Sequence, residues 1–178
     1  SSDVCSSDLS LSYQDKIVLK LIENYPNKDL DWNWHIISKI KNLPIEYIEK
    51  NLNKNWCWYS ISENINITIE FIKKNSNKNL NWYNISKNQN ITKDIIEKNQ
   101  DLNWNWEGIS KNPNIDLDFI DKNLDKPLNL SWLIMNKNIT WENIKKNSLW
   151  DFWTICNPNI TWNNILENLH IQWNWKYL

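Results

Sequence analysis

The chain has 178 residues, which is enough for one domain or one continuous array of repeats. Its formal net charge of −1 at pH 7 argues against a main role in binding a polyanion. No apolar run approaches the roughly 20 residues that span a bilayer, so we expect no membrane-spanning helix and no membrane partner.

The amino-acid alphabet is unusual. The chain contains 33 Asn, one Gly, no Ala and no Arg, so all 20 basic residues are Lys. Asn, Lys and Ile have A- and T-rich codons, which indicates an AT-rich genome. The single Trp codon is G-rich, yet there are 14 Trp. We therefore expect the Trp residues to be maintained by structure or function.

The first nine residues differ from the rest. Residues 1–9, SSDVCSSDL, resemble the translation of a sequencing-library adapter and are left out of the fold prediction; the alternative is a disordered Ser/Asp-rich N-terminus. Residues 10–30 include the apolar stretch SYQDKIVLKLIENY, which predicts a terminal helix that caps the rest of the chain. Without Cys5, the remaining Cys57 and Cys156 have no metal-binding spacing, and we predict buried thiols in a reducing compartment.

From residue 31 to 178 the sequence repeats every 24 residues. Several columns keep this interval: Ile48, Ile72, Ile96, Ile120, Ile144; Asn51, Asn75, Asn99, Asn123, Asn147; Trp34, Trp58, Trp82, Trp106; and Ser38, Ser62, Ser86, Ser110. A last repeat is shortened to 21 residues, and the chain then restarts one with WNWKYL. The pattern predicts about six repeats and a partial last one.

Each repeat has the features of a two-turn helix, for example Ile69 to Lys74. A Thr precedes it as a candidate N-cap (Thr68, Thr92, Thr140, Thr161). Ile67 and Ile72 have the N′ and N4 spacing of a hydrophobic staple. An acid follows the cap and a Lys stands near the end, as the helix dipole favours. The next residue is Asn, which we expect to end the helix in the left-handed conformation.

The other half of each repeat follows the WxW phrase. Trp58 and Ile61, like Trp106 and Ile109, are three residues apart, which predicts a second short helix; an extended segment is the alternative, because Trp, Tyr and Ile also favour strands. A leucine-rich repeat fits the length, but the LxxLxLxxN phrase is missing. Helices this short are unstable alone. We therefore predict an all-α fold of ~24-residue short-helix pairs stacked as an α-solenoid.

Two phrases resemble a known repeat. NPNITW at Asn157 to Trp162, and DKP at Asp125 to Pro127, are similar to the Trp- and Asn-rich tandem repeats (NPNITW…DKPWxW) of giant DNA viruses, over about residues 30 to 178. The resemblance implies an α-helical array and a viral origin, and it carries over no catalytic residue. The departures are Leu80 and Leu128 in place of the first Trp and Asp116 in place of the capping Thr; spacing is also irregular around Trp132 and Trp153.

The Trp and Lys columns are the candidate binding features. Large apolar residues at repeat spacing are typical of a core, and we predict one Trp of each pair to be buried. Two Trp at i and i+2 cannot face the same way, so the other column is the candidate surface, either for proteins or as stacking platforms for bases. The Lys columns, including Lys39, Lys87 and Lys111, predict a solvated face rather than a phosphate-binding stripe, because acids nearly balance them and Arg is missing.

Other motifs have structural explanations. Asn66, Asn84, Asn90, Asn138 and Asn159 match the N-glycosylation sequon, but a capping Thr and a turn Asn explain the phrase better. His35 and His170 have no recurring carboxylate or Cys partner. Gly108 is the single Gly, so no glycine-rich phosphate loop exists. We therefore predict no catalytic residue, no metal site and no cofactor.

The leading hypothesis is a non-enzymatic scaffold for protein–protein interaction, in the cytoplasm, and in an infected host cell if the origin is viral. Its candidate binding surface consists of Trp34, Trp58, Tyr83, Trp106, Glu107, Lys93 and Trp141. The alternative is a modular binder of single-stranded nucleic acid, which predicts exposed Trp or Lys rows. A third hypothesis is an array that only spaces other parts of a larger protein.

Overall fold

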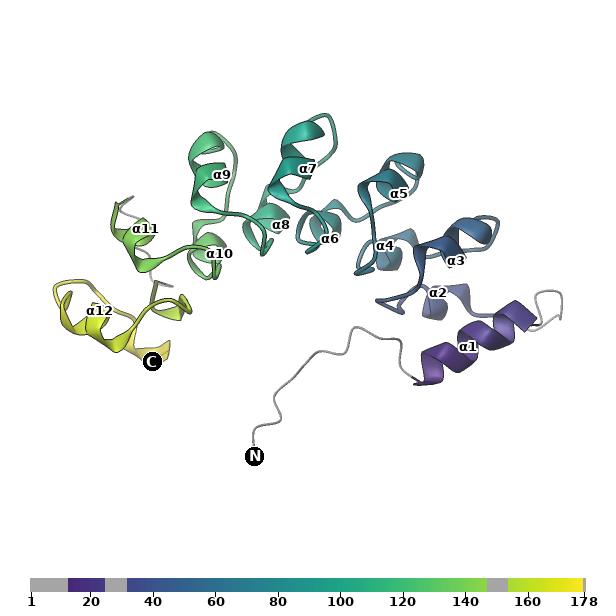
Figure 1. Cartoon of the computed structure of the whole chain (residues 1–178), viewed down its shortest axis with the longest axis horizontal. Coiled ribbons are helices and arrows are strands. Elements are labelled where there is room, and N and C mark those ends of the chain that lie inside the picture. The colour runs from purple at the N-terminus through teal and green to yellow at the C-terminus, as the bar shows by residue number, and fades with distance from the viewer. Residues whose placement is uncertain (1–12, 25–31, 147–153, 178) are drawn as a thin grey trace. The chain divides into compact units, whose positions relative to one another are not determined.

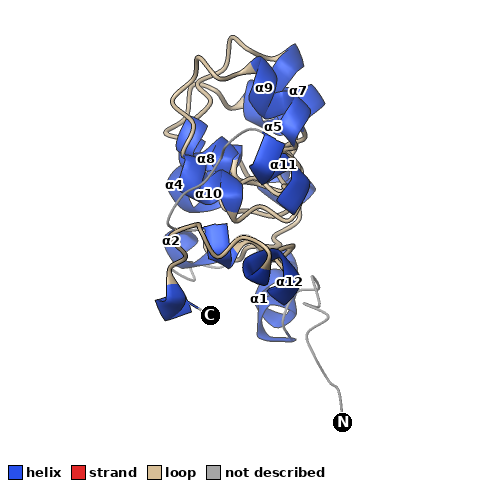
Figure 2. Cartoon of the chain, turned by 90° about the vertical axis from the view of Figure 1, so that its left-hand side faces the viewer, coloured by secondary structure: helices blue, strands red, loops and turns tan. Residues whose placement is uncertain are grey.

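The computed structural model describes residues 13–24, 32–146 and 154–177. Residues 1–9, predicted to lie outside the fold, fall outside the described part, as do the last repeat's residues around Trp153. Within the described ranges every regular element is a helix, and Figure 2 shows only helices and loops there. The chain divides into two blocks, residues 1–80 and 81–178, named here the N-terminal and C-terminal blocks.

The N-terminal block begins with the longest helix, which lies in the stretch predicted to be helical. Its elements are α1 (Tyr13–Asn24), α2 (Trp34–Ile37), α3 (Ile45–Lys50), α4 (Trp58–Ile61) and α5 (Ile69–Lys74). Short helices that begin at the second Trp of the WxW phrase alternate with six-residue helices that carry the IxKN phrase. We call them WxW helices (α2, α4) and IxKN helices (α3, α5).

The C-terminal block continues the alternation. Its elements are α6 (Trp82–Ser86), α7 (Lys93–Lys98), α8 (Trp106–Ser110), α9 (Leu117–Lys122), α10 (Leu130–Ile134), α11 (Trp141–Lys146), α12 (Trp162–Leu166) and two 3₁₀ turns, η1 (Thr154–Cys156) and η2 (Trp175–Tyr177). The WxW helices α6, α8 and α10 lie side by side in one row, and the IxKN helices α7 and α9 lie in another (Figure 1).

The IxKN helices begin as predicted. The Thr68 hydroxyl accepts a hydrogen bond from the Phe71 amide at 3.2 Å, which satisfies one of the free donors of the first turn. Asp116, which replaces the Thr in α9, accepts from the Phe119 amide in the same way. Ile67 and Ile72, the predicted staple, are both fully buried.

The ends of the IxKN helices differ from the prediction. The terminal Asn was expected to be left-handed, but Asn75 has φ −114° and Asn99 has φ −135°. The side chain ends the helix instead, because the Asn75 amide donates to the Phe71 carbonyl, four residues back, at 2.9 Å. This bond satisfies a carbonyl of the last turn without a left-handed residue.

The WxW segment is helical, so the extended alternative is wrong. An Asn between the two Trp caps it: the Asn105 side chain accepts from the Gly108 amide at 2.8 Å. Asn33, Asn81 and Asn129 act in the same way in α2, α6 and α10. In α4 the capping position is Cys57, which forms no side-chain cap.

The core is built from the repeated apolar columns. Ile48, Ile72, Ile96, Ile120 and Ile144 are all buried, and so is the first Trp of the pair at Trp56, Trp104 and Trp173. The indole N–H of Trp104 donates to the Asn99 carbonyl at 2.7 Å, so the buried ring keeps its polar atom satisfied. Each fully buried Ile side chain of these columns contributes roughly 1.5–3 kcal/mol to the free energy of folding.

Asparagine side chains join successive repeats. The Asn112 amide donates to the Ser86 and Ile91 carbonyls of the preceding repeat, both at 2.8 Å, and Asn136 donates to the Asn112 carbonyl at 2.9 Å. Several buried Asn of this column donate to carbonyls of the preceding repeat. We call four of them the asparagine ladder: Asn64, Asn112, Asn136 and Asn157. Buried backbone carbonyls between repeats are thereby satisfied.

The buried Ser column adds a second set of bonds between repeats. The Ser110 hydroxyl donates to the Trp106 carbonyl at 2.8 Å and accepts from the Asn129 amide of the next repeat at 2.8 Å. Ser38 makes the matching bonds with Trp34 and Cys57 in the N-terminal block. One hydroxyl therefore both ends a WxW helix and positions the start of the next.

Candidate protein-interaction surface

The second Trp of the pair, the predicted candidate column, is half-buried at Trp34, Trp58, Trp82 and Trp106, and it is exposed at Trp175. Trp58 stacks on Phe71 with ring centroids 6.1 Å apart, and Trp106 stacks on Phe119 at 6.4 Å. Trp34 instead meets Trp56 edge to face at 4.9 Å. In each case one side of the ring packs on another aromatic ring, so only part of the indole is open to solvent.

Lysines cover another side of these rings, a pairing that the sequence did not lead us to expect. The ammonium groups of Lys54 and Lys78 each lie 5.6 Å from the ring centroids of Trp34 and Trp58, and Lys126 lies 5.9 Å from Trp106. Each Lys stands 20 residues after its Trp, a constant offset that could have revealed the pairing. Such cation–π contacts contribute about 0.5–1 kcal/mol at exposed sites.

Residues from three WxW helices meet around Lys111. Its ammonium contacts the Tyr83 hydroxyl, lies 3.9 Å from the Trp132 ring centroid and 3.6 Å from the Glu107 carboxylate. The Lys111 side chain is 22% exposed, whereas Glu107 is 54% exposed. The cluster therefore has a sheltered cation at its centre and an aromatic and an acidic side chain open to solvent.

Gly108 allows α6 and α8 to approach closely enough to form this cluster. A Cβ at Gly108 would lie 2.6 Å from the Tyr83 carbonyl oxygen and 3.0 Å from the Ser86 Cβ. No side chain fits against a backbone atom at that distance. The single Gly of the sequence therefore brings Tyr83 and Glu107 together rather than forming a phosphate loop.

Two predicted surface residues have structural roles. Trp141 is only 6% exposed and stacks on Trp173 at 5.9 Å, within a core cluster with Ile165, so it does not lie on the surface. The Lys93 ammonium bonds the Asp116 carboxylate at 2.5 Å and thereby joins α7 to the cap of α9. Both residues belong to one column, and each contacts side chains of a neighbouring repeat.

The N-terminal block also presents varied side chains on its WxW helices. Ile36 of α2 is 61% exposed and Tyr59 of α4 is 58% exposed, and His35 is exposed beside Ile36. Tyr59 and Tyr83 occupy the same column, 24 residues apart. This column carries His35, Tyr59, Tyr83 and Glu107 in successive WxW helices, so it varies along the chain although two neighbouring repeats share Tyr.

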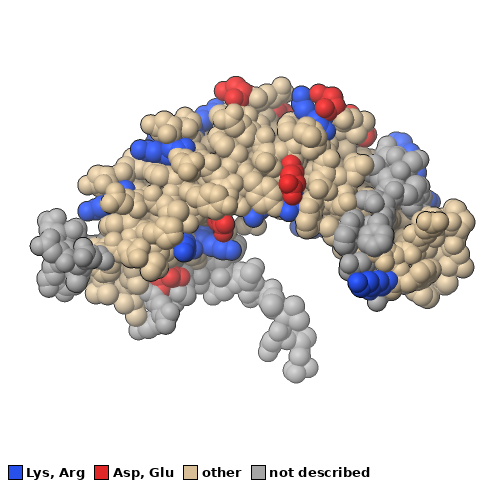
Figure 3. All heavy atoms as spheres, turned by 180° about the vertical axis from the view of Figure 1, so that it is seen from behind, with Lys and Arg blue, Asp and Glu red and all other residues tan. Residues whose placement is uncertain are grey.

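Many lysines are paired with acids of neighbouring repeats. Lys74 bonds Glu49 at 3.1 Å, and Lys122 lies 3.7 Å from Glu97. On the face shown in Figure 3, Lys and acidic residues lie in small separate groups without a continuous basic patch. This arrangement gives little concentrated positive potential for a phosphate backbone.

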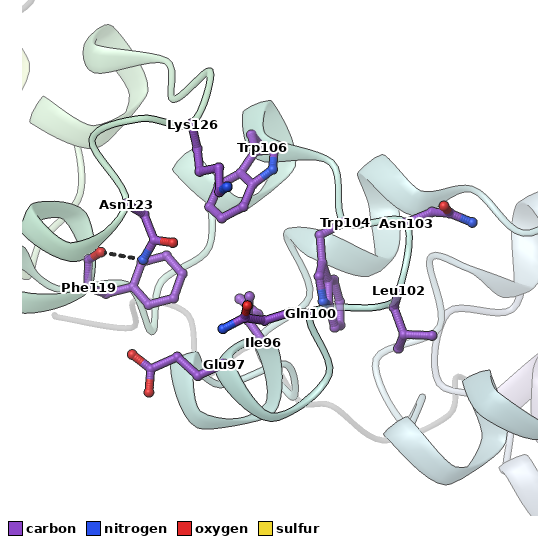
Figure 4. Close-up of a pocket in the computed structure, with 10 residues that line it drawn as sticks. All are labelled: Ile96, Glu97, Gln100, Leu102, Asn103, Trp104, Trp106, Phe119, Asn123 and Lys126. Carbon is purple, nitrogen blue, oxygen red and sulfur yellow. Dashed lines mark hydrogen bonds between the residues drawn. The ribbon is translucent and has the colours of Figure 1, made fainter.

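A cleft lies beside Trp106 in the C-terminal block. Figure 4 shows Trp104, Trp106, Phe119 and Lys126 around it, with Asn123 bonded to the Phe119 carbonyl at 2.8 Å. Its volume of about 230 Å³ is below the roughly 300–1,000 Å³ of small-molecule sites. In the N-terminal block, a groove of about 520 Å³ between α3 and α5 is lined by Glu46, Glu70 and the paired Glu49.

The sequons coincide with bonds between repeats. The side-chain amide nitrogen of Asn138 donates to the Pro113 carbonyl at 2.7 Å, and that of Asn159 donates to the Lys137 carbonyl at 2.7 Å. Asn66 bonds Asn42 in the same way at 3.0 Å, and Asn84 is buried. A glycan would have to replace a hydrogen on these nitrogens, so glycosylation would weaken the junctions.

The cysteines are less buried than predicted. Cys57 and Cys156 are both half-buried. The Ser60 hydroxyl donates to the Cys57 sulfur at 3.2 Å, and this bond lowers the pKa of the thiol although burial opposes it. Cys57 takes the place of the capping Asn, which explains its position near the surface at a helix start.

Two kinds of feature are absent from residues 13–24, 32–146 and 154–177. No group of three or more His, Cys, Asp or Glu side chains has the geometry to hold a metal ion. No helix combines the length and apolar character needed to cross a bilayer. Comparisons of the chain with protein-family models, curated proteins and solved structures gave no significant match.

Proposed function

We propose that the chain is a non-enzymatic scaffold, an α-solenoid of stacked helix pairs that binds other proteins through the solvent-facing side of its WxW helices. The observation that carries the proposal is the cluster of Tyr83, Glu107 and Trp132 around Lys111. These three residues lie on three successive WxW helices, α6, α8 and α10, and share one cation, and the column that holds Tyr83 and Glu107 varies between repeats.

The chemistry of the cluster supports protein binding. Tyr and Trp are enriched among the residues that dominate interface energies, because they bury a large area with little loss of side-chain freedom. Lys111 is already held by three neighbours, so it loses little mobility on binding. Glu107 offers a charge that would select a partner with a complementary cation.

The frame beneath the cluster supports the same proposal. The ladder Asn112 and the buried Ser86 use their polar groups to join repeats, and Gly108 sets the helix spacing. Variation at Tyr83 or Glu107 leaves these bonds in place. A repeat scaffold tunes its specificity by such variation on a constant frame.

The alternative, a single-stranded nucleic-acid binder, is less well supported. Trp58 and Trp106 have one side packed on Phe and another side near Lys, which leaves little room for a stacked base. Several Lys are paired with acids. A gel-shift titration with single-stranded RNA at low salt tests it, and we expect no binding.

A peptide-display selection on the chain tests the protein-binding proposal. The affinity of the enriched peptides is then measured for wild type, Glu107→Lys, Trp132→Ala and the control Asp121→Lys. The control makes the same charge change as Glu107→Lys, but on the exposed side of α9. We expect both cluster variants to weaken binding by about tenfold or more and the control to have no effect. Failure to enrich any peptide, or equal losses in the control, would contradict the proposal.

A further inference from the structure

Two lysines of the C-terminal block share one aromatic ring. The ammonium group of Lys87, which directly follows α6, lies 4.9 Å from the ring centroid of Tyr83. The Lys111 ammonium lies at the same distance from that centroid and also contacts the Tyr83 hydroxyl. The two ammonium groups are therefore at most twice 4.9 Å apart. This is near the Debye length of about 8 Å at physiological salt, so their mutual repulsion is only partly screened.

One acid balances these two cations. The Glu107 carboxylate lies 3.6 Å from the Lys111 ammonium. Lys87 forms no ion pair with any acid of residues 13–24, 32–146 and 154–177, and it is only half-buried. The cluster around Lys111 therefore has an unneutralised positive charge beside the Tyr83 ring. A carboxylate that a partner brings to Lys87 would neutralise this charge.

Charge and apolar surface are divided among the three WxW helices of the cluster. Lys87 follows α6, and Glu107 belongs to α8. On α10, the columns of Glu107 and Lys111 carry the uncharged Ser131 and Met135, while Trp132 is 38% exposed. Along the row α6, α8, α10 in Figure 1, the surface thus offers a cation, then an acid, then an aromatic ring.

The cation and the acid are close enough to be met by one short segment. Distances of 4.9, 4.9 and 3.6 Å link Lys87 to Glu107 through the Tyr83 ring and the Lys111 ammonium, which limits the separation of the two charges to about 13 Å. An extended chain advances about 3.3 Å per residue. Two partner side chains up to about four residues apart can therefore reach both charges.

We propose that this surface recognises a short peptide segment of mixed charge, in which an acidic and a basic side chain lie within about four residues of each other. The acid pairs with Lys87, the base pairs with Glu107, and a large apolar side chain packs on Trp132. The inference rests on the proposed function and specifies its partner. A purely basic segment would meet the unneutralised Lys87, and a purely acidic one would meet Glu107, so both are disfavoured.

The N-terminal block provides a matched control, because it lacks this arrangement. Glu63 occupies the position of Lys87 one repeat earlier and lies 4.0 Å from Lys41. Lys39 occupies the same column one repeat before Glu63 and is exposed. Lys39→Glu therefore makes the same charge change as Lys87→Glu at the equivalent position of another repeat.

The test compares peptide-display selections on the full chain as wild type, Lys87→Glu, Lys87→Gln and Lys39→Glu, with circular dichroism to check that each variant folds. Wild type and Lys39→Glu should enrich peptides that contain both an acid and a base. Lys87→Glu should enrich peptides with a base in place of the acid. Wild-type-selected peptides should bind Lys87→Glu about tenfold or more weakly, and Lys87→Gln should have a smaller effect.

A charge-reversed peptide makes the test independent of folding. When the acid of a wild-type-selected peptide is replaced by Lys, the peptide should bind Lys87→Glu about tenfold more tightly than it binds wild type. Misfolding of the variant could not produce this gain. Equal affinity of wild type and Lys87→Glu for the acidic peptide, or enriched peptides that contain no acid, would overturn the inference.

The same selections separate this inference from the proposed function. Peptides that lose affinity on Glu107→Lys and Trp132→Ala but not on Lys87→Glu would leave the proposed function in place and overturn only the mixed-charge partner. Failure to enrich any peptide would remove both. Single-stranded RNA that binds wild type but not Lys87→Glu would assign the unneutralised charge to a phosphate backbone and would also overturn the inference.

Discussion

The side-chain amide of Asn112 donates to the main-chain carbonyl of Ser86, 26 residues earlier, at 2.8 Å. The same amide reaches the Asn88 and Ile91 carbonyls, while its oxygen accepts from the Asn114 amide at 2.9 Å. One buried residue therefore connects several backbone groups of two repeats. Short helices that would be unstable alone are held in register by such bonds as well as by apolar packing.

Asn112→Ala should be strongly destabilising. It leaves buried carbonyls and the Asn114 amide without their partner, and each unsatisfied buried group costs about 1–3 kcal/mol. We expect a loss of about 2–4 kcal/mol in the free energy of unfolding, measured by urea denaturation. Asn103→Ala, at an exposed position, should change it by less than about 0.5 kcal/mol. Equal effects of the two substitutions would show that the ladder does not stabilise the fold.

Gly108→Ala should destabilise the C-terminal block despite the higher helix propensity of Ala. The new Cβ would collide with the Tyr83 carbonyl, so α6 and α8 must move apart. Overpacking of this kind costs about 1–3 kcal/mol, against a propensity gain of about 1 kcal/mol. Ser60→Ala, in the same column of α4, is the control: it introduces no clash and loses only the hydrogen bond to the Cys57 sulfur, so it should cost no more than about 1 kcal/mol. A rise in the melting temperature of Gly108→Ala would refute the close approach of α6 and α8.

Trp104→Leu should be tolerated better than Trp104→Ala. The repeats with Leu80 and Leu128 show that Leu fits this column, so the main loss is the indole hydrogen bond to Asn99 and some packing, about 1–2 kcal/mol. Trp104→Ala leaves a cavity and should cost about 3–5 kcal/mol. Thermal or urea unfolding of both variants measures the difference. Similar losses of stability for Trp104→Leu and Trp104→Ala would mean that Leu cannot replace Trp at this position.

The Lys93–Asp116 pair should give stability a defined pH dependence. Burial raises the pKa of Asp116, but hydrogen bonds from Lys93 and the Phe119 amide more than offset it and leave the pKa lowered; the bond to Asp116 raises the pKa of Lys93. A lowered carboxyl pKa stabilises the fold above the unfolded value of about 3.9, and this is lost as pH falls through the folded value. The Lys93 contribution is lost in turn as pH rises through its raised pKa.

Lys93→Met checks this dependence. In this variant the NMR-measured pKa of Asp116 should rise, and the stability difference from wild type should be present near pH 7 and vanish in strong acid. Lys98→Met, on the exposed side of the same helix, should leave the Asp116 pKa unchanged. An unchanged Asp116 pKa in Lys93→Met would contradict the pairing.

Much of the fold could be predicted because the repeat aligns the local signals. The Thr68 cap, the Ile67–Ile72 staple and the helix over Ile69–Lys74 depend on residues close in sequence, and each recurs every 24 residues. The WxW helix was a weaker prediction, since its Trp and Ile also favour strands. The Asn between the two Trp caps the helix and thereby favours it over a strand. This Asn is visible in the sequence but was not identified there as a cap.

The contacts between repeats could not be predicted in the same way. The ladder bonds of Asn112 reach carbonyls more than 20 residues away, so no pattern of neighbouring residues indicates them. Asn75, at the C-terminal end of α5, was predicted to be left-handed, but its side-chain amide instead donates to the Phe71 carbonyl of the last turn. The cluster around Lys111 depends on helix spacing set by Gly108, and no local pattern reveals which columns meet.

The central claim is that the WxW helices bind partners while the ladder and core only maintain the frame. Amide hydrogen exchange of the chain, with and without a display-selected peptide, tests it most directly. We expect added protection at α6, α8 and α10, around Tyr83, Glu107 and Trp132. Protection confined to α7 and α9, with the three WxW helices unchanged, would contradict the claim.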